Sequence, residues 1–465
     1  MTTDYPDPRS AKLGLIVLCT VIFFSVVNGN MINVALPFIG RDFGVTEGTY
    51  GWVVTGFALA FAVFNAIHGR LAGRIGLRRL YVAGVVVLGV TSLLLALSPT
   101  IGFAITLRVI QGAGAAALPA LGTVILARLF PPDRRGAAMG WALATVGVAA
   151  SIGPFLGGIL VALGGWRLTF AVTTVVLLAI PAIWRLLPAS LDERHDEPFD
   201  LIGATLLVIG VSAVLYAFNI VDRLGPGLEM GGLLGLGALC LVLFGWRIHA
   251  AEDPFVEPDL FKDLRYVLAS LVGFLGNATR FGTIVLVPIF LVEVNQVSPV
   301  VVGLVLLPGA LCIAVLSPWS GRLGDRIGAR TPVIAGTVLI IAGNIVTALT
   351  AGGPILGPMA GMTLYGLGFA LIQSPLVSAV SQILPPRQSG TGMGLYLMIF
   401  FLGGAFGVAL SVTAVELQAP GATGWFGLTD GPGAVYSNAI FTLTALAIVA
   451  LALTPGIPGV RPKPR

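Results

Sequence analysis

Two arginines of this chain lie inside long apolar segments, where a charged side chain is costly. Arg108 falls in the apolar run 102–126, and Arg280 lies near the middle of the run 266–292. An ionised group at the centre of a bilayer costs about 2.5–3.5 kcal/mol on insertion scales, so such residues usually serve a function. A guanidinium there can bind an anion or link charge to movement. Arg108 could instead extend its head group to the outer surface, which lies only about one or two turns away.

Amide side chains accompany these arginines along the chain. We expect Arg108 and Arg280 to share a substrate cavity with five amides, namely Asn28, Asn33, Gln111, Asn277 and Gln373. Asn28 and Arg280 each stand 41 positions before the first glycine of a phrase that occurs twice, described below. This spacing predicts that the two side chains approach one cavity from two related halves of the protein.

Carboxylates, by contrast, are missing from the middle of every apolar run. The nearest are Asp222, Glu293 and Glu416, all at predicted outer ends, where they are either proton sites or solvated loop residues. A cavity built from arginines and amides favours neutral or anionic amphipathic molecules over lipophilic dications. The chain shows no nucleophile–base arrangement, metal-ligand cluster or phosphate loop, so we expect neither an enzyme nor a cofactor.

Composition places these residues in a membrane protein. The chain has 465 residues, of which 56% are hydrophobic and only 10% charged, whereas soluble proteins carry about 25% charged residues. A spanning helix takes about 20 apolar residues. Fourteen apolar runs are predicted, and no run alternates as a membrane strand does. They lie near 13–37, 51–69, 80–98, 102–126, 138–163, 168–187, 201–221, 231–248, 266–292, 299–320, 331–350, 355–379, 391–415 and 436–455.

The runs divide as six, two and six. We therefore predict an N-terminal six-helix bundle over 13–187, an inserted helix pair over 201–248 and a C-terminal six-helix bundle over 266–455. Of the 26 Lys and Arg residues, two lie inside runs, three fall on outer loops and the remaining 21 on inner loops and tails. This bias predicts a multi-pass protein of the cell membrane with both termini in the cytoplasm. It also explains the net charge of +5 without a nucleic-acid partner.

A basic, glycine-rich phrase joins two runs in each half of the chain. The phrase at 69–79 and the phrase at 321–331 lie 252 positions apart and agree at seven of eleven positions. Such a repeat indicates an internally duplicated transporter. The copies differ at one telling place, where Gly73 corresponds to Asp325. The residues expected to form the gating loops are Gly69, Arg70, Gly73, Arg74, Gly76, Gly321, Arg322, Asp325, Arg326 and Gly328.

These motifs resemble the major facilitator superfamily, and in particular its fourteen-helix drug:proton antiporters. The phrase resembles the connector between helices 2 and 3, and Arg108-x-x-Gln111-Gly112 resembles the helix-4 signature. Asn33-Val34-Ala35-Leu36-Pro37 resembles the end of helix 1 in that subfamily. The resemblance covers nearly the whole chain. The residues that resemble the helix-5 antiporter signature are Gly140, Gly153, Pro154, Gly157 and Gly158.

The resemblance implies two pseudo-symmetric bundles around a central cavity, with alternating access and bacterial multidrug efflux as the function. We expect a monomer that exports small amphipathic molecules, with the bilayer and protons as its other partners. Asn28 departs from the pattern, because many fourteen-helix cation exporters carry an acid there and asparagine cannot titrate. An uncoupled facilitator, or an exporter of lipids or anionic metabolites, therefore remains an alternative. A non-transporting membrane sensor is favoured less.

The mismatch in the repeated phrase predicts an asymmetric inner gate. By resemblance, the acid of the phrase bridges helices within its own half, and a carboxylate near a helix N-terminus gains about 0.3–1 kcal/mol. Asp325→Asn should therefore slow transport more than Gly73→Ala, when initial rates are measured in inverted vesicles with matched protein levels. Equal rates for the two variants would contradict the asymmetry.

Overall fold

The protein is a long bundle of helices. The computed structural model describes residues 7–188, 191, 200–219, 228–251, 258–384, 389–418, 423–425 and 431–457, and all regular structure in these ranges is helical, as the sequence predicts. Apolar surroundings offer the backbone no water, so each segment bonds its own N–H and C=O groups within a helix.

The described residues up to 188 form seven α-helices and a short 3₁₀ helix. Their bounds are α1 Pro8–Phe43, α2 Glu47–Ile75, α3 Leu77–Ala96, α4 Ile101–Ala115, α5 Ala117–Leu129, α6 Pro132–Thr173, η1 Thr174–Ala179 and α7 Ile180–Leu186. The remaining elements are α8 Leu201–Asn219, α10 Leu228–Ala250, η3 Pro258–Lys262, α11 Leu264–Glu293, α12 Pro299–Ile327, α13 Arg330–Leu349, α14 Leu356–Ile383, α15 Ser389–Glu416, α16 Gly433–Leu453 and η5 Thr454–Gly456.

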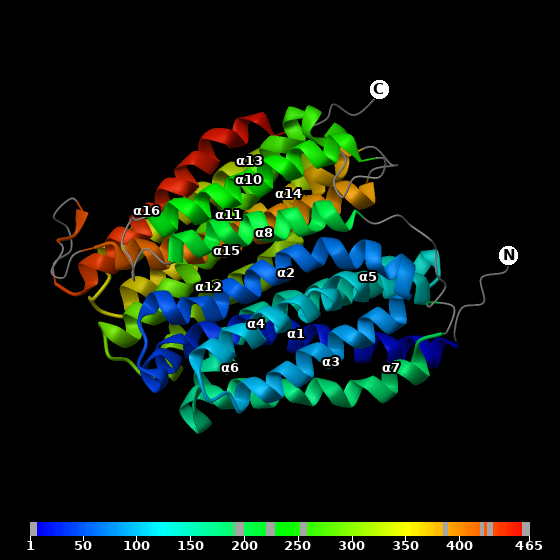
Figure 1. The fold of residues 1–465 in the computed structure, drawn as a ribbon, viewed down its shortest axis with the longest axis horizontal. Helices are drawn as coiled ribbons and strands as arrows, with labels where there is room; N and C mark the ends of the chain where they lie inside the picture. Colours follow the sequence, from blue (N-terminus) through cyan, green and yellow to red (C-terminus); the bar gives the residue numbers. More distant parts are fainter. Residues whose placement is uncertain are drawn as a thin grey trace.

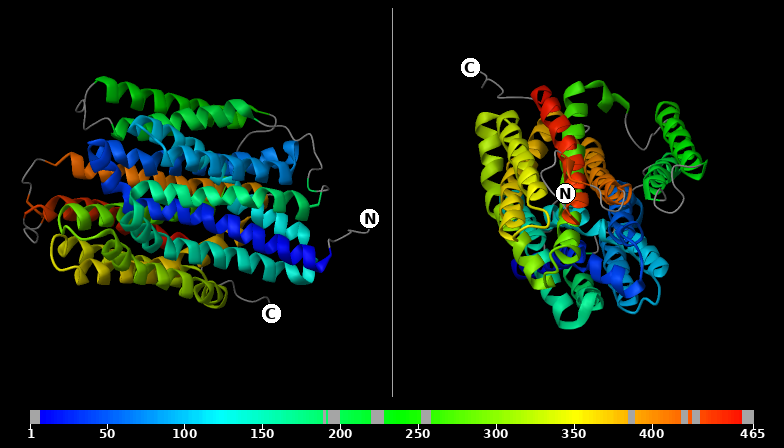
Figure 2. Two further views of the ribbon diagram at one scale, coloured as in Figure 1. Left: turned by 90° about the horizontal axis from the view of Figure 1, so that it is seen from below. Right: turned by 90° about the vertical axis from the view of Figure 1, so that its left-hand side faces the viewer.

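Most helices run along the long axis of the molecule. In Figure 1, α1 to α7 fill the lower side, whereas α11 and α13 to α16 fill the upper side. The two groups touch mainly through α2 against α15 and α6 against α12. Helices α8 and α10 pack against each other along one flank of the bundle, where α8 contacts α2 and α15 (Figure 2).

The predicted count of fourteen spanning helices is not confirmed. Twelve helices of the described chain are long and apolar enough to cross a membrane. One of these candidate spans, Ile152–Leu186, runs through Gly164 and Gly165, whose backbone angles are not helical. The apolar part of α8, Ile202–Val214, is shorter than the others.

Most residues of the repeated phrase belong to helices and not to a loop between them. α2 continues to Ile75 and α12 to Ile327, so the connection to the next helix is Gly76 alone in the first copy and Gly328 with Ala329 in the second. Gly76 has φ 96° and Gly328 has φ 84°, a region that side chains with a Cβ rarely adopt. These glycines occupy the same position in the two phrases, so the duplication preserves the backbone geometry of the turn.

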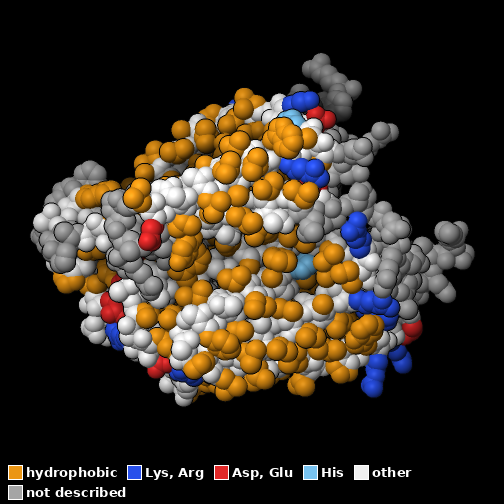
Figure 3. Space-filling model, viewed as in Figure 1, with side chains coloured by type: hydrophobic (Ala, Val, Ile, Leu, Met, Phe, Trp, Pro, Cys, Tyr) orange, Lys and Arg blue, Asp and Glu red, His pale blue; other side chains and the backbone are white. Residues whose placement is uncertain are grey.

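Charged and apolar side chains occupy different parts of the molecular surface. Orange apolar side chains cover the flanks of the bundle in Figure 3, and most of the visible Lys and Arg side chains gather at its right-hand end. That is the end at which α1 begins and α16 finishes (Figure 1). The apolar flank is the surface that a lipid bilayer would cover.

Glycines allow the helices of one half to approach each other closely. At Gly112 of α4, an added Cβ would collide with the backbone of Phe57 in α2, whereas at Gly102 of the same helix it would meet nothing within 4 Å. Backbone atoms cannot move aside as a flexible side chain can, so the α2–α4 contact requires glycine at 112.

Gly112→Ala should therefore lower stability by about 1–3 kcal/mol, the usual cost of overpacking. The measurement is the midpoint of thermal unfolding of the purified protein in detergent. Gly102→Ala is the matched control in the same helix and should leave the midpoint unchanged. If both variants melt together with the natural protein, the contact is looser than described.

Candidate functional site

The guanidinium of Arg108 lies at the centre of the N-terminal group of helices. Its side chain is fully buried, and Nε donates to the carbonyl of Val53 in α2 at 2.8 Å. Nη1 donates to Asn28 Oδ1 of α1 at 3.0 Å and to Gln111 Oε1 at 2.6 Å. The ring of Phe57 covers the guanidinium, with its centroid 4.1 Å from Cζ. Arg108 therefore does not extend to the outer surface.

The hydrogen bonds continue beyond the arginine. Gln111 Nε2 donates to Ser92 Oγ of α3 at 2.7 Å, and Asn28 Nδ2 donates to Thr173 Oγ1 of α6 at 3.1 Å. The structure thus brings three predicted cavity residues together, Asn28, Arg108 and Gln111. The hydrogen bonds of these three side chains join α1, α2, α3, α4 and α6. No described carboxylate is bonded to Arg108.

Arg280 occupies a different environment, between the two groups of helices. It lines a small pocket with Ala150 and Pro154 of α6, and with residues of α11, α12 and α14 that include Tyr365. Phe369 of α14 lies under the guanidinium, with the ring centroid 4.5 Å from Cζ. The hydroxyl of Tyr365 is buried and has no hydrogen-bond partner among the described residues. Arg280 is predicted to face the substrate cavity, and it lines a pocket that residues of both halves form.

The remaining predicted amides are scattered. Asn277 Nδ2 donates to the carbonyl of Phe400 in α15 at 2.8 Å, so it joins two helices of the C-terminal group. Asn33 is completely buried, and neither of its amide atoms has a partner among the described residues. Gln373 is half-buried on α14. Asn28 does not share the pocket of Arg280, because its side chain bonds inside the first group.

Contacts join the two halves at the end of the bundle where α1 finishes and α2 begins. Arg41 of α1 forms an ion pair with Glu293 of α11 at 3.2 Å. Tyr436 of α16 donates a hydrogen bond of 2.5 Å to Glu47 of α2. Glu293 is one of the predicted proton sites, and in the structure its carboxylate pairs with Arg41 of the other half. Glu416, another, lies against Gly48 of α2, and Asp222 falls outside the described residues.

Sequence reasoning missed Glu47, Tyr436 and Arg41. Glu47 is the first residue of α2, where an acid is an ordinary helix-start residue because of the helix dipole. Tyr436 follows it by 389 positions, so no local pattern links the two side chains. Only the approach of Tyr436 from α16 to the first residue of α2 distinguishes this acid from a cap.

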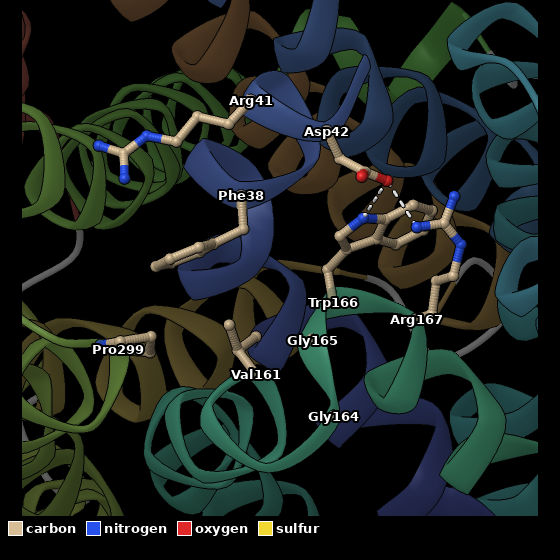
Figure 4. A pocket seen from close by; sticks show the side chains of 9 residues that line it. All are labelled: Phe38, Arg41, Asp42, Val161, Gly164, Gly165, Trp166, Arg167 and Pro299. Carbon is tan, nitrogen blue, oxygen red and sulfur yellow. Dashed lines mark hydrogen bonds and ion pairs between the residues drawn. The ribbon is translucent and has the colours of Figure 1, made fainter. Parts of the chain in front are cut away.

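A pocket of about 430 Å³ opens at the same end, where α1, α6 and α12 meet (Figure 4). Asp42 there accepts hydrogen bonds from Trp166 Nε1 at 3.1 Å and from Arg167 Nη1 at 2.5 Å. These partners belong to one group of helices. Arg41 points away from them, across the pocket mouth, as Figure 4 shows.

The glycines of the predicted helix-5 signature lie on two faces of α6. At Gly153 and Gly157 an added Cβ would strike α1, at Asn30 and Met31, and at Gly158 it would strike the backbone of Pro299 in α12. Gly158 therefore permits close contact between the halves. The surroundings of Gly140 lie outside the described residues.

The predicted gating residues are described only in part. Arg74 and Arg326 are exposed at the ends of α2 and α12. Gly321 lies on α12 beside Ser374 of α14. The surroundings of Gly69, Arg70, Gly73, Arg322 and Asp325 lie outside the described part of the chain.

Comparison with known proteins identifies the family. The model of the Major Facilitator Superfamily matches residues 18–408. The chain belongs to this superfamily. It is similar to multidrug resistance protein Stp of Mycobacterium tuberculosis, with 31% identity over 88% of this chain and 77% of that protein. It is also similar to puromycin resistance protein pur8 of Streptomyces alboniger, with 31% identity over 87% and 82%.

A further relative and a solved structure are also transporters, although their names differ from those of the drug-resistance proteins. Riboflavin transporter RibZ of Clostridioides difficile is 27% identical over 85% of this chain and 86% of its own. A bacterial homolog of the human lysosomal transporter Spinster, solved inward-facing and unoccupied, superposes with a TM-score of 0.69. That structure shares 16% identity over 96% and 97% of the two chains, so it shows the fold alone. The superfamily member described here is a multi-pass membrane transporter and not an enzyme.

Replacement of Arg108 should test whether its fork of hydrogen bonds holds the N-terminal helices of this transporter together. Arg108→Lys keeps the charge but cannot reach Val53, Asn28 and Gln111 at once, and each lost bond to a charged group is worth about 1.5–3 kcal/mol. We expect a marked drop in the thermal unfolding midpoint and loss of transport. Arg167→Lys, at the half-exposed Asp42 pair, is the matched control and should keep the midpoint. A stable Arg108→Lys would refute the structural role.

Proposed function

We propose that this transporter exports small amphipathic molecules by alternating access, and that it is closed here on its outer side. The observation that carries the proposal is the set of contacts that bridge the halves at one end. These are the Arg41–Glu293 ion pair, the Tyr436–Glu47 hydrogen bond and the packing of Gly158 on Pro299. Such contacts between two groups of helices are what must break when a rocking transporter opens outward.

We propose that the chain crosses the membrane fourteen times, with both termini in the cytoplasm. The protein would lie in the plasma membrane as a monomer. Two features support the count beyond twelve candidate spans. The turn at Gly164 and Gly165 would divide one candidate span into two crossings, and α8 would add one more beside α10, which is already among the twelve. The corresponding parts are a bundle over 13–187, an inserted pair over 201–248 and a bundle over 266–455.

The substrate cavity that we propose is centred on Arg280. Its guanidinium has no carboxylate partner among the described residues, so a negative substrate group would supply the missing charge. Tyr365 offers an unused hydroxyl, and Phe369 offers an aromatic face to an apolar substrate body. Among the other predicted cavity residues, Asn28, Arg108 and Gln111 would support the walls, because they are bonded inside one half.

Proton coupling is the second part of the proposal. The acids at the outer end, Glu293 and Glu416, are the described candidates, and Asp222 remains a candidate from the sequence alone. The alternative is an uncoupled facilitator or an exporter of lipids or anionic metabolites. One observation favours it, because the pocket that spans the halves holds an arginine and no described carboxylate.

Reconstitution in liposomes tests both ideas at once. Vesicles that contain a pH-sensitive dye would be supplied with ethidium as a cation, puromycin as an amine and fluorescein as an aromatic anion. A proton flux that appears only with transported compounds establishes antiport. Transport of fluorescein without any proton flux would establish the facilitator, and no transport of any compound would reject efflux of this class.

Arg280→Ala should reduce the initial rate of fluorescein transport by about tenfold or more, because a charged hydrogen bond is worth about 1.5–3 kcal/mol. Arg280→Lys should recover part of the rate. Arg265→Ala is the control, since that arginine is exposed at the start of the same helix and pairs with Asp263. An unchanged rate in Arg280→Ala would remove Arg280 from the substrate site.

A further inference from the structure

Glu47 stands out at the outer closure because its carboxylate faces the opposite half of the transporter without a cation. Its Oε1 accepts the hydrogen bond of 2.5 Å from the Tyr436 hydroxyl. Its Oε2 is buried and has no hydrogen-bond partner among the described residues. The other bridging acid, Glu293, already pairs with Arg41. An ionised carboxylate in such a place is costly unless something compensates its charge.

Every element packed around Glu47 contributes a group that bears on its charge. α1 supplies Arg41, which is engaged by Glu293 of α11, and Asp42, which is engaged by Arg167. α15 supplies Glu416, whose carboxylate lies against Gly48, the residue after Glu47. The remaining neighbours are the phenols Tyr436 of α16 and Tyr50 of α2. Glu47 therefore lies within electrostatic reach of the carboxylate of Glu293, and two like charges repel each other strongly in a poorly solvated place.

Tyr50 supplies an independent observation. Its side chain is 4% exposed and packs on Gly40 of α1. It lies within electrostatic reach of Glu47, Glu293, Glu416 and Tyr436, and it offers no positive charge to compensate these carboxylates. The carboxyl group of Glu47 thus has an uncharged neighbour on its own helix, and its Oε2 stays without a partner among the described residues.

We propose that Glu47 binds a proton from the outer solution and that this proton holds the outer side closed. The proton resides on Oε2, the buried oxygen without a partner among the described residues, while Oε1 continues to accept from Tyr436. When the halves separate, Tyr436 leaves, water reaches the carboxyl group, and the proton returns to the outer solution. The site thus makes closure depend on external pH without carrying the proton across the membrane. It rests on the alternating access proposed above, but not on proton antiport.

The test is a distance measured between the outer ends of the two halves. Leu97, which follows α3, and Leu356, which begins α14, are exposed there on opposite halves. Spin labels on Leu97→Cys and Leu356→Cys would be read in nanodiscs, after Cys19, Cys240 and Cys312 are replaced by serine. From about pH 8 to about pH 5, the ratio of short to long distances should rise by up to about tenfold per pH unit, the limit for one linked proton.

Three variants make the result specific. Glu47→Gln is neutral and keeps an oxygen for Tyr436, so it should show the short distance at every pH. Tyr436→Phe removes the bond between halves and should favour the long distance. Asp42→Asn is the matched control, because this acid lies at the same end but bonds within its own half, and it should respond to pH as the natural protein does.

The outcomes separate this inference from the proposed function. A wild-type pH response in Glu47→Gln overturns the proton site. A distance that changes when fluorescein is added, but not with pH, also overturns it while alternating access stands. A distance that responds to neither rejects alternating access and the proton site together. Correct folding of each variant is checked by its elution as a single species of natural size.

Discussion

The fork of hydrogen bonds around Arg108 is the interaction on which the N-terminal half depends. A guanidinium in the apolar interior cannot turn to water, so its charge must be met by oxygen atoms of the protein. Oxygen atoms from α1, α2 and α4 meet it, and the chain of bonds runs on to α3 and α6. A half that is tied together in this way can move as one body, and alternating access requires such a body.

Close backbone contacts complement that network. Gly112 brings α4 onto α2 within one half, while Gly158 brings α6 onto α12 across the halves. In an apolar solvent there is little hydrophobic drive between helices, so short backbone distances and interhelical hydrogen bonds supply the attraction. The interior of each half is therefore tightly bonded. The polar contacts that join the halves at one end are fewer, namely a half-exposed ion pair and one hydrogen bond from a tyrosine, and an exposed ion pair contributes little energy.

The two halves share a fold but divide their polar chemistry unequally. Arg108 is sealed inside the first half, whereas Arg280 reaches a pocket between the halves. The repeat predicted that Asn28 and Arg280 would face one cavity, but Asn28 is bonded to Arg108 and Thr173 and does not line the pocket of Arg280. Duplication preserves helices and turns more faithfully than it preserves partners. Gly76 and Gly328 keep the same turn, because it depends on local backbone sterics alone.

The sequence by itself determined that this protein is a helical membrane transporter with related halves, because apolar length, turn glycines and charge bias are local properties. It also singled out Arg108, Gln111, Arg280 and Glu293 as residues of interest. Only the tertiary structure decided which of them meet. Tyr436 and Glu47 are joined across 389 positions, and an acid at a helix start looks the same whether water or a tyrosine faces it. Partners are set by how helices from distant parts of the chain pack, and no local pattern records that packing.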